Sequence, residues 1–521
     1  MTPAAAAARS ARLSALAARA LSPWCPGSTG ARRLNLQAAT DTTDSTKLKS
    51  KEDLPGPSFA KTLYWILLKG YADKSHLLQD VQRNLYGPIW RSRFGQYDLV
   101  NVATAELISQ VIRQEGRYPV RVLLPHWKEY RDMRGQAYGL HVETGPEWHR
   151  IRAALNPKML KVREVQPYAP VVHQVVSDLL QRIERLRGRS HDGDTVSDIA
   201  AELYKFGFEG ISSILFETRL VAWREVPEDT LRFIRGVNDM LDLSNMVALL
   251  PRWTRSFLPH WRRFVQAWDD ICDVAQSLIE RRLKELEEQV QSGAPPTGLY
   301  LTYLLSNEQL SRAEVYTSIT ELLLGGVDTR LLCLSSDVQH SLVGAVPSVR
   351  DQRAQDRLYS EVVEACPDRR EPSVDDLNQM PFLKAVIKET LRLYPVVPGN
   401  GRFVTENDLI VGGYWFPKET QFHLCHYSVC HSPDEFPDPE SFVPERWVRP
   451  GQNTDGAYSR ALPTVQRHHP YSYIPFGVGV RACVGKRVAE MEMYFALSRL
   501  MQQYEVRPEE GAPVIEPKTR T

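Results

Sequence analysis

The feature that most constrains this 521-residue chain is a ten-residue segment near its C-terminal end, Phe476 to Gly485. It reads FGVGVRACVG, so a single cysteine, Cys483, follows Arg481 by two residues in a turn punctuated by glycines. A helical pattern begins directly afterwards, at Lys486. A thiolate near backbone donors and a helix N-terminus is stabilised as an anion and can serve as a metal ligand. The small residues let a flat macrocycle approach the backbone closely.

The segment resembles the haem-binding loop of cytochromes P450, F-x-x-G-x-R-x-C-x-G, at every fixed position: Phe476, Gly479, Arg481, Cys483 and Gly485. The resemblance implies heme b (iron-protoporphyrin IX) as the cofactor, with the Cys483 thiolate as its axial ligand. Such a ligand favours O–O cleavage. The resemblance also implies the cytochrome P450 fold, which is mainly α with small β-sheets. A buried structural thiol is the alternative interpretation of Cys483.

Composition limits the classes of protein and partner that fit this chain. The chain has 64 Lys and Arg against 63 Asp and Glu, so its charge gives no reason to expect a nucleic-acid partner. A chain of this length usually holds more than one domain, unless a cofactor organises one large core. Seven cysteines are too few to predict a disulfide scaffold. Six of them lack metal-ligand spacing and are interpreted as small hydrophobic or surface thiols: Cys25, Cys272, Cys333, Cys366, Cys425 and Cys430.

The first 45 residues differ from the rest. They contain five arginines, many Ala and Ser, and no acidic residue before Asp41. This composition predicts a mitochondrial transit peptide over residues 1–45, with a disordered tail as the alternative. Later segments contain no run of 18 or more apolar residues, so no membrane span is expected. The folded domain is expected over residues 50–521.

The periodicity of the folded part predicts many helices and a small sheet. Residues 88–94 and 98–102 read as paired strands, and further strand signals lie at 409–411 and 420–424. Residues 145–330 read as mostly helical. The clearest helical face has apolar residues spaced four and three apart: Phe264, Trp268, Ile271, Ala275 and Leu278.

Glu389 and Arg392 stand three residues apart, where side chains on one helical face can pair. By itself this pattern is common and indicates a solvated surface pair. Here Leu-Tyr-Pro follows it, and the segment Phe442–Trp447 lies downstream. The arrangement is similar to the P450 charge triad, which implies that Glu389, Arg392 and Arg446 stabilise the haem-side core. Their implied role is structural.

The same resemblance implies cationic partners for the two haem propionates. Trp148 and Arg152 form a W-x-x-x-R pattern, and Arg402 and Arg481 match further propionate-contacting positions. The planar fork of arginine suits carboxylates. Core packing is the alternative role for Trp148, and Arg150 reads as an exposed helix charge.

The segment Leu323–Thr329 resembles the centre of the long distal helix of P450 proteins. The resemblance implies that Asp328 and Thr329 deliver protons to dioxygen, which is general acid catalysis. The glycines before them would leave room for that ligand. Without the resemblance, an Asp-Thr helix cap would be preferred.

Together with the transit peptide, the resemblance points to mitochondrial P450 proteins, on the matrix side of the inner membrane. Those proteins receive electrons from an adrenodoxin-type ferredoxin and its NADPH-dependent reductase. Lys384 and Lys388 match the lysines that dock the ferredoxin, and their spacing puts them on one helix face. Ordinary surface lysines are the alternative. Residues 249–253 and 257–259 mix apolar and basic side chains, as a peripheral membrane contact would, and a core or loop position is the alternative.

Residues 113–121 and 393–398 are most similar to sterol 26/27-hydroxylases. This implies O2-dependent hydroxylation of a sterol side chain, on cholesterol-derived sterols or bile acid intermediates. Relatives that act on vitamin D or retinoids remain alternatives. Composition by itself indicates no sterol preference.

Two departures from the family pattern concern activity. Residues 330–349 are atypical, and Gly344 and Pro347 fall where a helix should continue. Read one nucleotide later, codons permitted for residues 337–349 spell the family continuation, which suggests a frame error or mis-splice. Family members also continue with a short β segment where this sequence ends at Thr521, so the C-terminal strand is expected to be missing here. A haem-binding but non-functional splice or gene-model variant is therefore the rival to an active enzyme.

Overall fold

The structure is a computed structural model of the chain. It describes residues 48–94, 97–121, 123–217, 219, 226–293, 300–342, 352–448 and 468–507, with only the backbone for residue 94 and residues 328–342. The predicted transit peptide and the chain beyond residue 507 lie outside the described residues.

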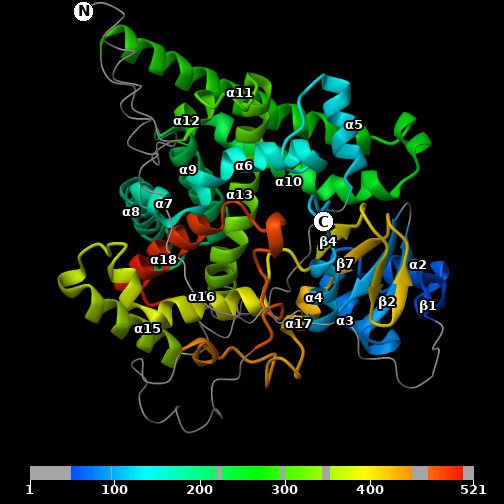
Figure 1. Cartoon of the computed structure of the whole chain (residues 1–521). Helices are drawn as coiled ribbons and strands as arrows, with labels where there is room; N and C mark the ends of the chain where they lie inside the picture. Colours follow the sequence, from blue (N-terminus) through cyan, green and yellow to red (C-terminus); the bar gives the residue numbers. More distant parts are fainter. Residues whose placement is uncertain are drawn as a thin grey trace, which may run out of the picture. The chain divides into compact units, whose positions relative to one another are not determined.

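Helices dominate the described part of the chain, as the sequence predicts (Figure 1). No described helix combines the length and apolar content needed to cross a bilayer. The helices are α2 (Phe59–Leu67), α3 (Ser75–Tyr86), α4 (Ala105–Arg113), α5 (Pro125–Arg134), α6 (Gly145–Leu160), α7 (Val162–Val165), α8 (Ala169–Arg187), α9 (Ile199–Phe216), α10 (Glu228–Leu249), α11 (His260–Gln291), α12 (Leu301–Leu305), α13 (Arg312–Leu342), α15 (Gln352–Ala365), α16 (Pro381–Leu393), α17 (His426–Cys430) and α18 (Lys486–Gln503).

Short 3-10 turns connect several of these helices. They are η1 (Lys51–Asp53), η2 (Gln166–Tyr168), η3 (Arg252–Ser256), η4 (Pro367–Arg369), η5 (Asp376–Gln379), η6 (Pro444–Trp447) and η7 (Gly479–Arg481).

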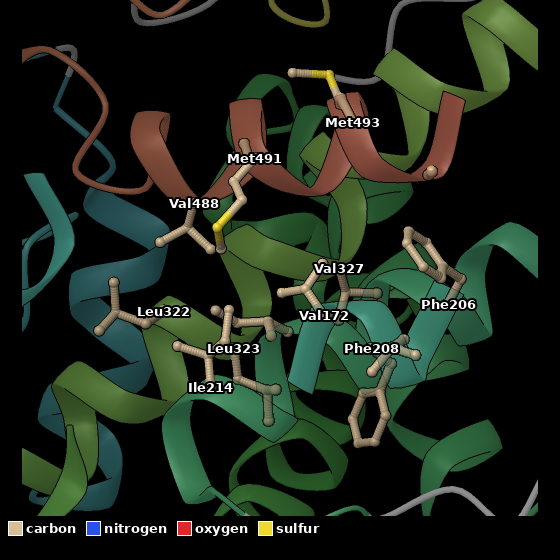
Figure 2. Packing of buried hydrophobic residues seen from close by; sticks show 14 of the residues in the cluster. Val172, Phe206, Phe208, Ile214, Leu322, Leu323, Val327, Val488, Met491 and Met493 are labelled. Carbon is tan, nitrogen blue, oxygen red and sulfur yellow. The ribbon is translucent and has the colours of Figure 1, made fainter. Parts of the chain in front are cut away.

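The predicted apolar face of α11 is buried along its length, from Phe264 to Leu278. The helix ends at Gln291, just before Gly293, whose positive φ of 76° suits a glycine. Side chains of α8, α9, α13 and α18 gather in one hydrophobic cluster (Figure 2). The core therefore surrounds α13, the long helix that carries Asp328 and Thr329.

The strands form two small sheets. In the larger one, β2 (Ile89–Phe94) and β3 (Tyr97–Val102) make the expected antiparallel hairpin. The chain then returns far downstream, where β7 (Gln421–Leu424) pairs parallel to β3 and β4 (Asn400–Phe403) pairs antiparallel to β7.

The smaller sheet has the order β1 (Lys49–Ser50), β6 (Tyr414–Phe416), β5 (Leu409–Val411). In Figure 1 the strands gather with α2, α3 and α4, apart from the cluster of α8, α9 and α18. The observed strands confirm the predicted strand segments, whereas the pairing partners could not be read from local patterns.

Candidate functional site

The cysteine loop is a tight turn held by its own backbone. The Cys483 amide donates to the Phe476 carbonyl at 2.8 Å, and the Ala482 amide donates to the Gly479 carbonyl at 3.1 Å. Gly477 and Gly479 both have a φ of 70°, which disfavours other residues. A Cβ on Gly479 would also lie 2.7 Å from a carboxylate oxygen of Glu115. The turn places the half-buried Cys483 just before α18.

Three arginines from distant parts of the chain hold the carbonyls of this loop. Arg402 of β4 donates to the Val478 carbonyl at 2.9 Å. Arg121 donates to the Arg481 carbonyl at 2.7 Å, and Arg152 of α6 donates to the Ala482 carbonyl at 2.7 Å. The geometry of the loop is therefore fixed from outside as well as from within.

Arg481 turns away from the loop toward Trp148. Its guanidinium lies 3.5 Å from the centroid of the indole ring, a close cation–π contact. Its Nε donates to the Pro119 carbonyl at 2.6 Å, and its Nη1 to the Leu140 carbonyl at 3.4 Å. Trp148 and Arg481, each expected to contact a propionate, thus lie together, and both side chains are buried.

The site has a marked excess of positive charge. Glu115 pairs with Arg402 at 2.5 Å, and the charge of Glu321 also acts on Arg121. Burial, together with the nearby charges of Arg121, Arg402 and Arg152, lowers the pKa of Arg481 to about 9. Burial raises the pKa of Glu115, although Arg402 and Arg481 oppose that rise.

Two buried donor atoms are left over, Arg152 Nε and Arg481 Nη2, which have no hydrogen-bond partner among the described residues. Buried cations require anionic partners. A dianionic ligand such as the two propionates of a haem fits this donor set. A Cβ on Gly485 would meet no atom within 4 Å, so the described residues leave that side of the loop open. The residues present therefore fit the cofactor.

The predicted charge triad is assembled in the core. Arg392 donates from Nε and Nη2 to the two carboxylate oxygens of Glu389, at 3.0 and 2.9 Å. Arg446 of η6 donates to the same carboxylate at 3.2 Å, and the Trp447 indole donates at 2.8 Å. Arg392 also donates to the carbonyls of Cys430, Pro439 and Ser441.

In the distal helix, α13, the two glycines have different surroundings. A Cβ on Gly326 would lie 2.6 Å from Ile211 of α9, whereas one on Gly325 would meet no atom within 4 Å in the part of the chain that the structure describes. Asp328 and Thr329 lie within the helical backbone of α13, so they are not a helix cap. Their side chains lie outside the described residues, as do residues 343–349 of the atypical segment.

Arg150 differs from its expected role as an exposed charge. It is half-buried and pairs with Glu314 of α13 and Glu147. The ion pair with Glu314 joins α6 to α13. Helical periodicity alone could not predict this contact.

Lys384 and Lys388 lie one turn apart on α16. Burial lowers the pKa of Lys384, and the charge of Lys388 lowers it further, so the two ammonium groups are close enough to repel. Lys388 is exposed and lies 5.8 Å from the Trp447 ring.

Cys366, Cys425 and Cys430 are buried, in agreement with their interpretation as small hydrophobic residues. Burial raises the pKa of Cys430 to about 12, so this thiol stays protonated near neutral pH. Among the residues that the structure describes, no His, Cys, Asp and Glu cluster could hold a metal ion.

Sequence reasoning missed Arg121 and Glu115 as parts of the site. Arg121 contacts a loop 360 residues away in sequence, and Glu115 pairs with a residue 287 away. Both lie in the segment 113–121 that drew attention by resemblance. The local pattern gave no sign of what they would contact.

Comparison with known proteins agrees with this geometry. The family model described as Cytochrome P450 matches residues 54–520. Mitochondrial sterol 26-hydroxylase of Rattus norvegicus is 42% identical over 468 residues, covering 89% of this chain and 85% of the relative. Mitochondrial 25-hydroxyvitamin D-1 alpha hydroxylase of Homo sapiens is 39% identical, covering 91% and 90%.

Cytochrome P450 27C1 of Aquarana catesbeiana is 36% identical, covering 90% of this chain and 85% of the relative. The crystal structure of the cytochrome P450DA heme domain superposes with a TM-score of 0.67 at 20% identity, covering 87% and 90% of the two chains. This likeness concerns the fold.

A helical core around α13, with a cysteine loop held by a cluster of arginines, defines a haem-thiolate protein. The chain belongs to the cytochrome P450 family. It is a monooxygenase, and its cofactor is heme b with a cysteine thiolate ligand. The expected fold and the resemblance to sterol 26/27-hydroxylases are confirmed.

Proposed function

We propose that this monooxygenase hydroxylates the side chain of a cholesterol-derived sterol or bile acid intermediate at the 26/27 position, with Cys483 as the iron ligand. The observation that carries the site assignment is the buried arginine cluster around the Cys483 loop, with its two unpartnered donors. The sterol assignment is supported by the identity to sterol 26-hydroxylases, which exceeds that to the vitamin D hydroxylase.

In this proposal, bound haem supplies thiolate-assisted activation of O2. Trp148, Arg152, Arg402 and Arg481 orient and neutralise the propionates, while Phe476, Gly479 and Gly485 shape the loop. Asp328 and Thr329 hold and deliver protons from α13. The triad of Glu389, Arg392 and Arg446 stabilises the core behind the loop, where its buried charges satisfy one another.

We further propose that electrons come from an adrenodoxin-type ferredoxin, with its NADPH-dependent reductase, that docks at Lys384 and Lys388. The paired ammonium groups on α16 support this role because an acidic partner would relieve their mutual repulsion. Reversing the exposed charge with Lys388→Glu should raise the KM for ferredoxin, and this KM should then depend less on the salt concentration. Lys418→Glu, at another exposed lysine, is the control. Equal effects of both substitutions would argue against this docking site.

The proposed location is the matrix side of the mitochondrial inner membrane, with residues 1–45 as the transit peptide. Relatives with mitochondrial names support the compartment. Peripheral membrane contact is supported by exposed apolar side chains: Leu67 and Leu68 at the end of α2 are 67% and 76% exposed, and Trp253 and Phe257 near η3 are 68% and 63% exposed.

The deciding experiment is a reduced carbon monoxide difference spectrum followed by turnover with ferredoxin and reductase. Cholesterol, a vitamin D secosteroid and a retinoid form the substrate panel. A thiolate-type Soret band with hydroxylated sterol as the main product supports the proposal. A secosteroid or retinoid as the main product would show that the sterol assignment is wrong. A thiolate-type Soret band without any product would favour the haem-binding but non-functional splice or gene-model variant.

A repaired chain, with residues 337–349 replaced by the family continuation, should be measured beside the natural sequence. Turnover only in the repaired chain would locate the defect in the distal helix. Sequencing the transcript decides separately whether residues 330–349 are encoded in frame.

A further inference from the structure

The distal helix carries a buried acid that has no part in the proposed chemistry. Glu321 lies on α13 about two helical turns before Asp328, and its side chain is only 1% exposed. An ionised carboxylate this deeply buried is costly unless charged or hydrogen-bonding groups surround it. Its partners come from outside the helix.

Glu321 contacts two residues of the α5 region. Its Oε2 accepts from the His141 amide at 3.1 Å and lies 3.1 Å from the His141 ring nitrogen Nδ1. Its Oε1 faces Nη2 of Arg131 at 3.7 Å. Burial by itself raises the pKa of Glu321, but His141 and Arg131 outweigh it and the pKa ends below its ordinary value. Glu321 is therefore ionised near neutral pH.

Arg131 is as deeply buried as the acid. It is 2% exposed, lies 4.8 Å from the Trp268 ring, and donates through Nη1 to the Gln136 side chain at 2.6 Å. One guanidinium thus connects the distal-helix carboxylate to the start of the segment that follows α5.

That segment, residues 136–141, is attached to α13 at several points. The Ala137 carbonyl accepts from Thr317 of α13 at 3.3 Å. Gly139 lies so close that a Cβ there would be 2.4 Å from Glu321 Oε2. On its other side, the Leu140 carbonyl accepts from Arg481 at 3.4 Å. The segment therefore lies between the distal helix and the arginine beside the cysteine loop.

We propose that Glu321 is a positioning residue: through Arg131 and His141 it fixes residues 136–141 between α13 and Arg481. The consequence is mechanical coupling between the distal helix and the arginines around the Cys483 loop. Its expected effect on haem rests on the proposed role of Arg481 in binding a propionate.

The test is hydrogen–deuterium exchange on the holoenzyme carrying Glu321→Gln. Glutamine keeps the shape and can still accept from the His141 amide, but it leaves Arg131 without a counter-charge. We expect residues 136–141 to exchange about tenfold faster, while α16 and α18 change only with global stability. Glu314→Gln removes a carboxylate from the same helix near its exposed end and should leave residues 136–141 unchanged.

A double variant, Arg131→Met with Glu321→Gln, separates positioning from stability. It removes the unpaired cation, so the thermal midpoint should recover while exchange over residues 136–141 stays fast. Exchange that stays slow in Glu321→Gln, or that returns to normal together with the thermal midpoint in the double variant, would overturn the inference.

Transfer of haem to apomyoglobin distinguishes this inference from the proposed propionate site. We expect Glu321→Gln to speed haem loss several-fold and Arg481→Met to speed it more. If Arg481→Met leaves haem loss unchanged, the propionate assignment is wrong, whereas fast exchange in Glu321→Gln would still establish the positioning role.

Discussion

At the scale of single residues, the site consists of a few side chains whose charges depend on one another. Cys483 has its backbone fixed by Phe476, and three arginines hold the carbonyls around it. The cationic groups outnumber the carboxylates beside them, so an anionic ligand would stabilise the site. Glu389 is the reverse case, an anion fully enclosed by donors.

Replacing Cys483 with serine should abolish the thiolate-type carbon monoxide spectrum and the oxidation of substrate, because a hydroxyl group is not an anionic ligand near neutral pH. Circular dichroism serves as the control for folding. A variant that retains the parent spectrum would contradict the assignment of Cys483 as the iron ligand.

Replacing Glu389 with glutamine should destabilise the protein by about 3–5 kcal/mol, because the buried Arg392 and Arg446 lose their shared counter-charge. Urea unfolding of the parent and the variant measures the difference. Glu445→Gln, which removes a partially exposed partner of Arg357 close by, should cost much less. Equal losses would mean that the triad is not a special source of stability.

At the scale of elements, the central contact is that of α13 with α9. Gly326 allows the two helices to approach, since any larger residue would collide with Ile211. A Cβ on Gly325, one position earlier, would meet no atom of the described residues within 4 Å. The family resemblance drew attention to both glycines without separating their roles.

Gly326→Ala should therefore destabilise the protein by about 1–3 kcal/mol through overpacking. Gly325→Ala should be neutral or stabilising by up to about 1 kcal/mol, because alanine is the better helix former. Thermal unfolding of the two apoproteins tests this pair. The reverse ranking would show that the close approach at Gly326 does not set the helix spacing.

At the scale of the whole molecule, folding buries several histidines in the neutral form. Burial lowers the pKa of His76, His126 and His426 to about 4. His426 shows why: it is fully buried, and burial disfavours the charged imidazolium more than the hydrogen bond to the Val397 carbonyl favours it.

Because each folded-state pKa lies below the unfolded value of 6.5, the unfolded chain binds more protons between these values. Stability should therefore be full above about pH 6.5 and fall as the pH drops toward 4. Each ring contributes on the order of 3 kcal/mol to this loss. Thermal midpoints across this range measure it, and His426→Gln should flatten the profile. A flat profile in the parent would contradict neutral burial.

The cysteine loop, the E-x-x-R pair and the helical periodicities could be read from the sequence because each is local: its residues are neighbours along the chain or share one helical face. They were enough to predict the family, the cofactor, and the helix-rich fold with its strand segments. The grouping of Glu389 with Arg446 also followed, but only because the family resemblance connects the two segments.

The tertiary structure alone decided which distant groups meet. Arg121, Glu115, Arg131 and Glu321 look like ordinary surface charges in the sequence, and folding places them in buried contacts. Their roles depend on burial and on partners far away in the chain, and burial is what turns an exposed charge into one that must be paired. The burial and the pairing of these side chains are set by the tertiary fold, so the local spacing of residues cannot predict them.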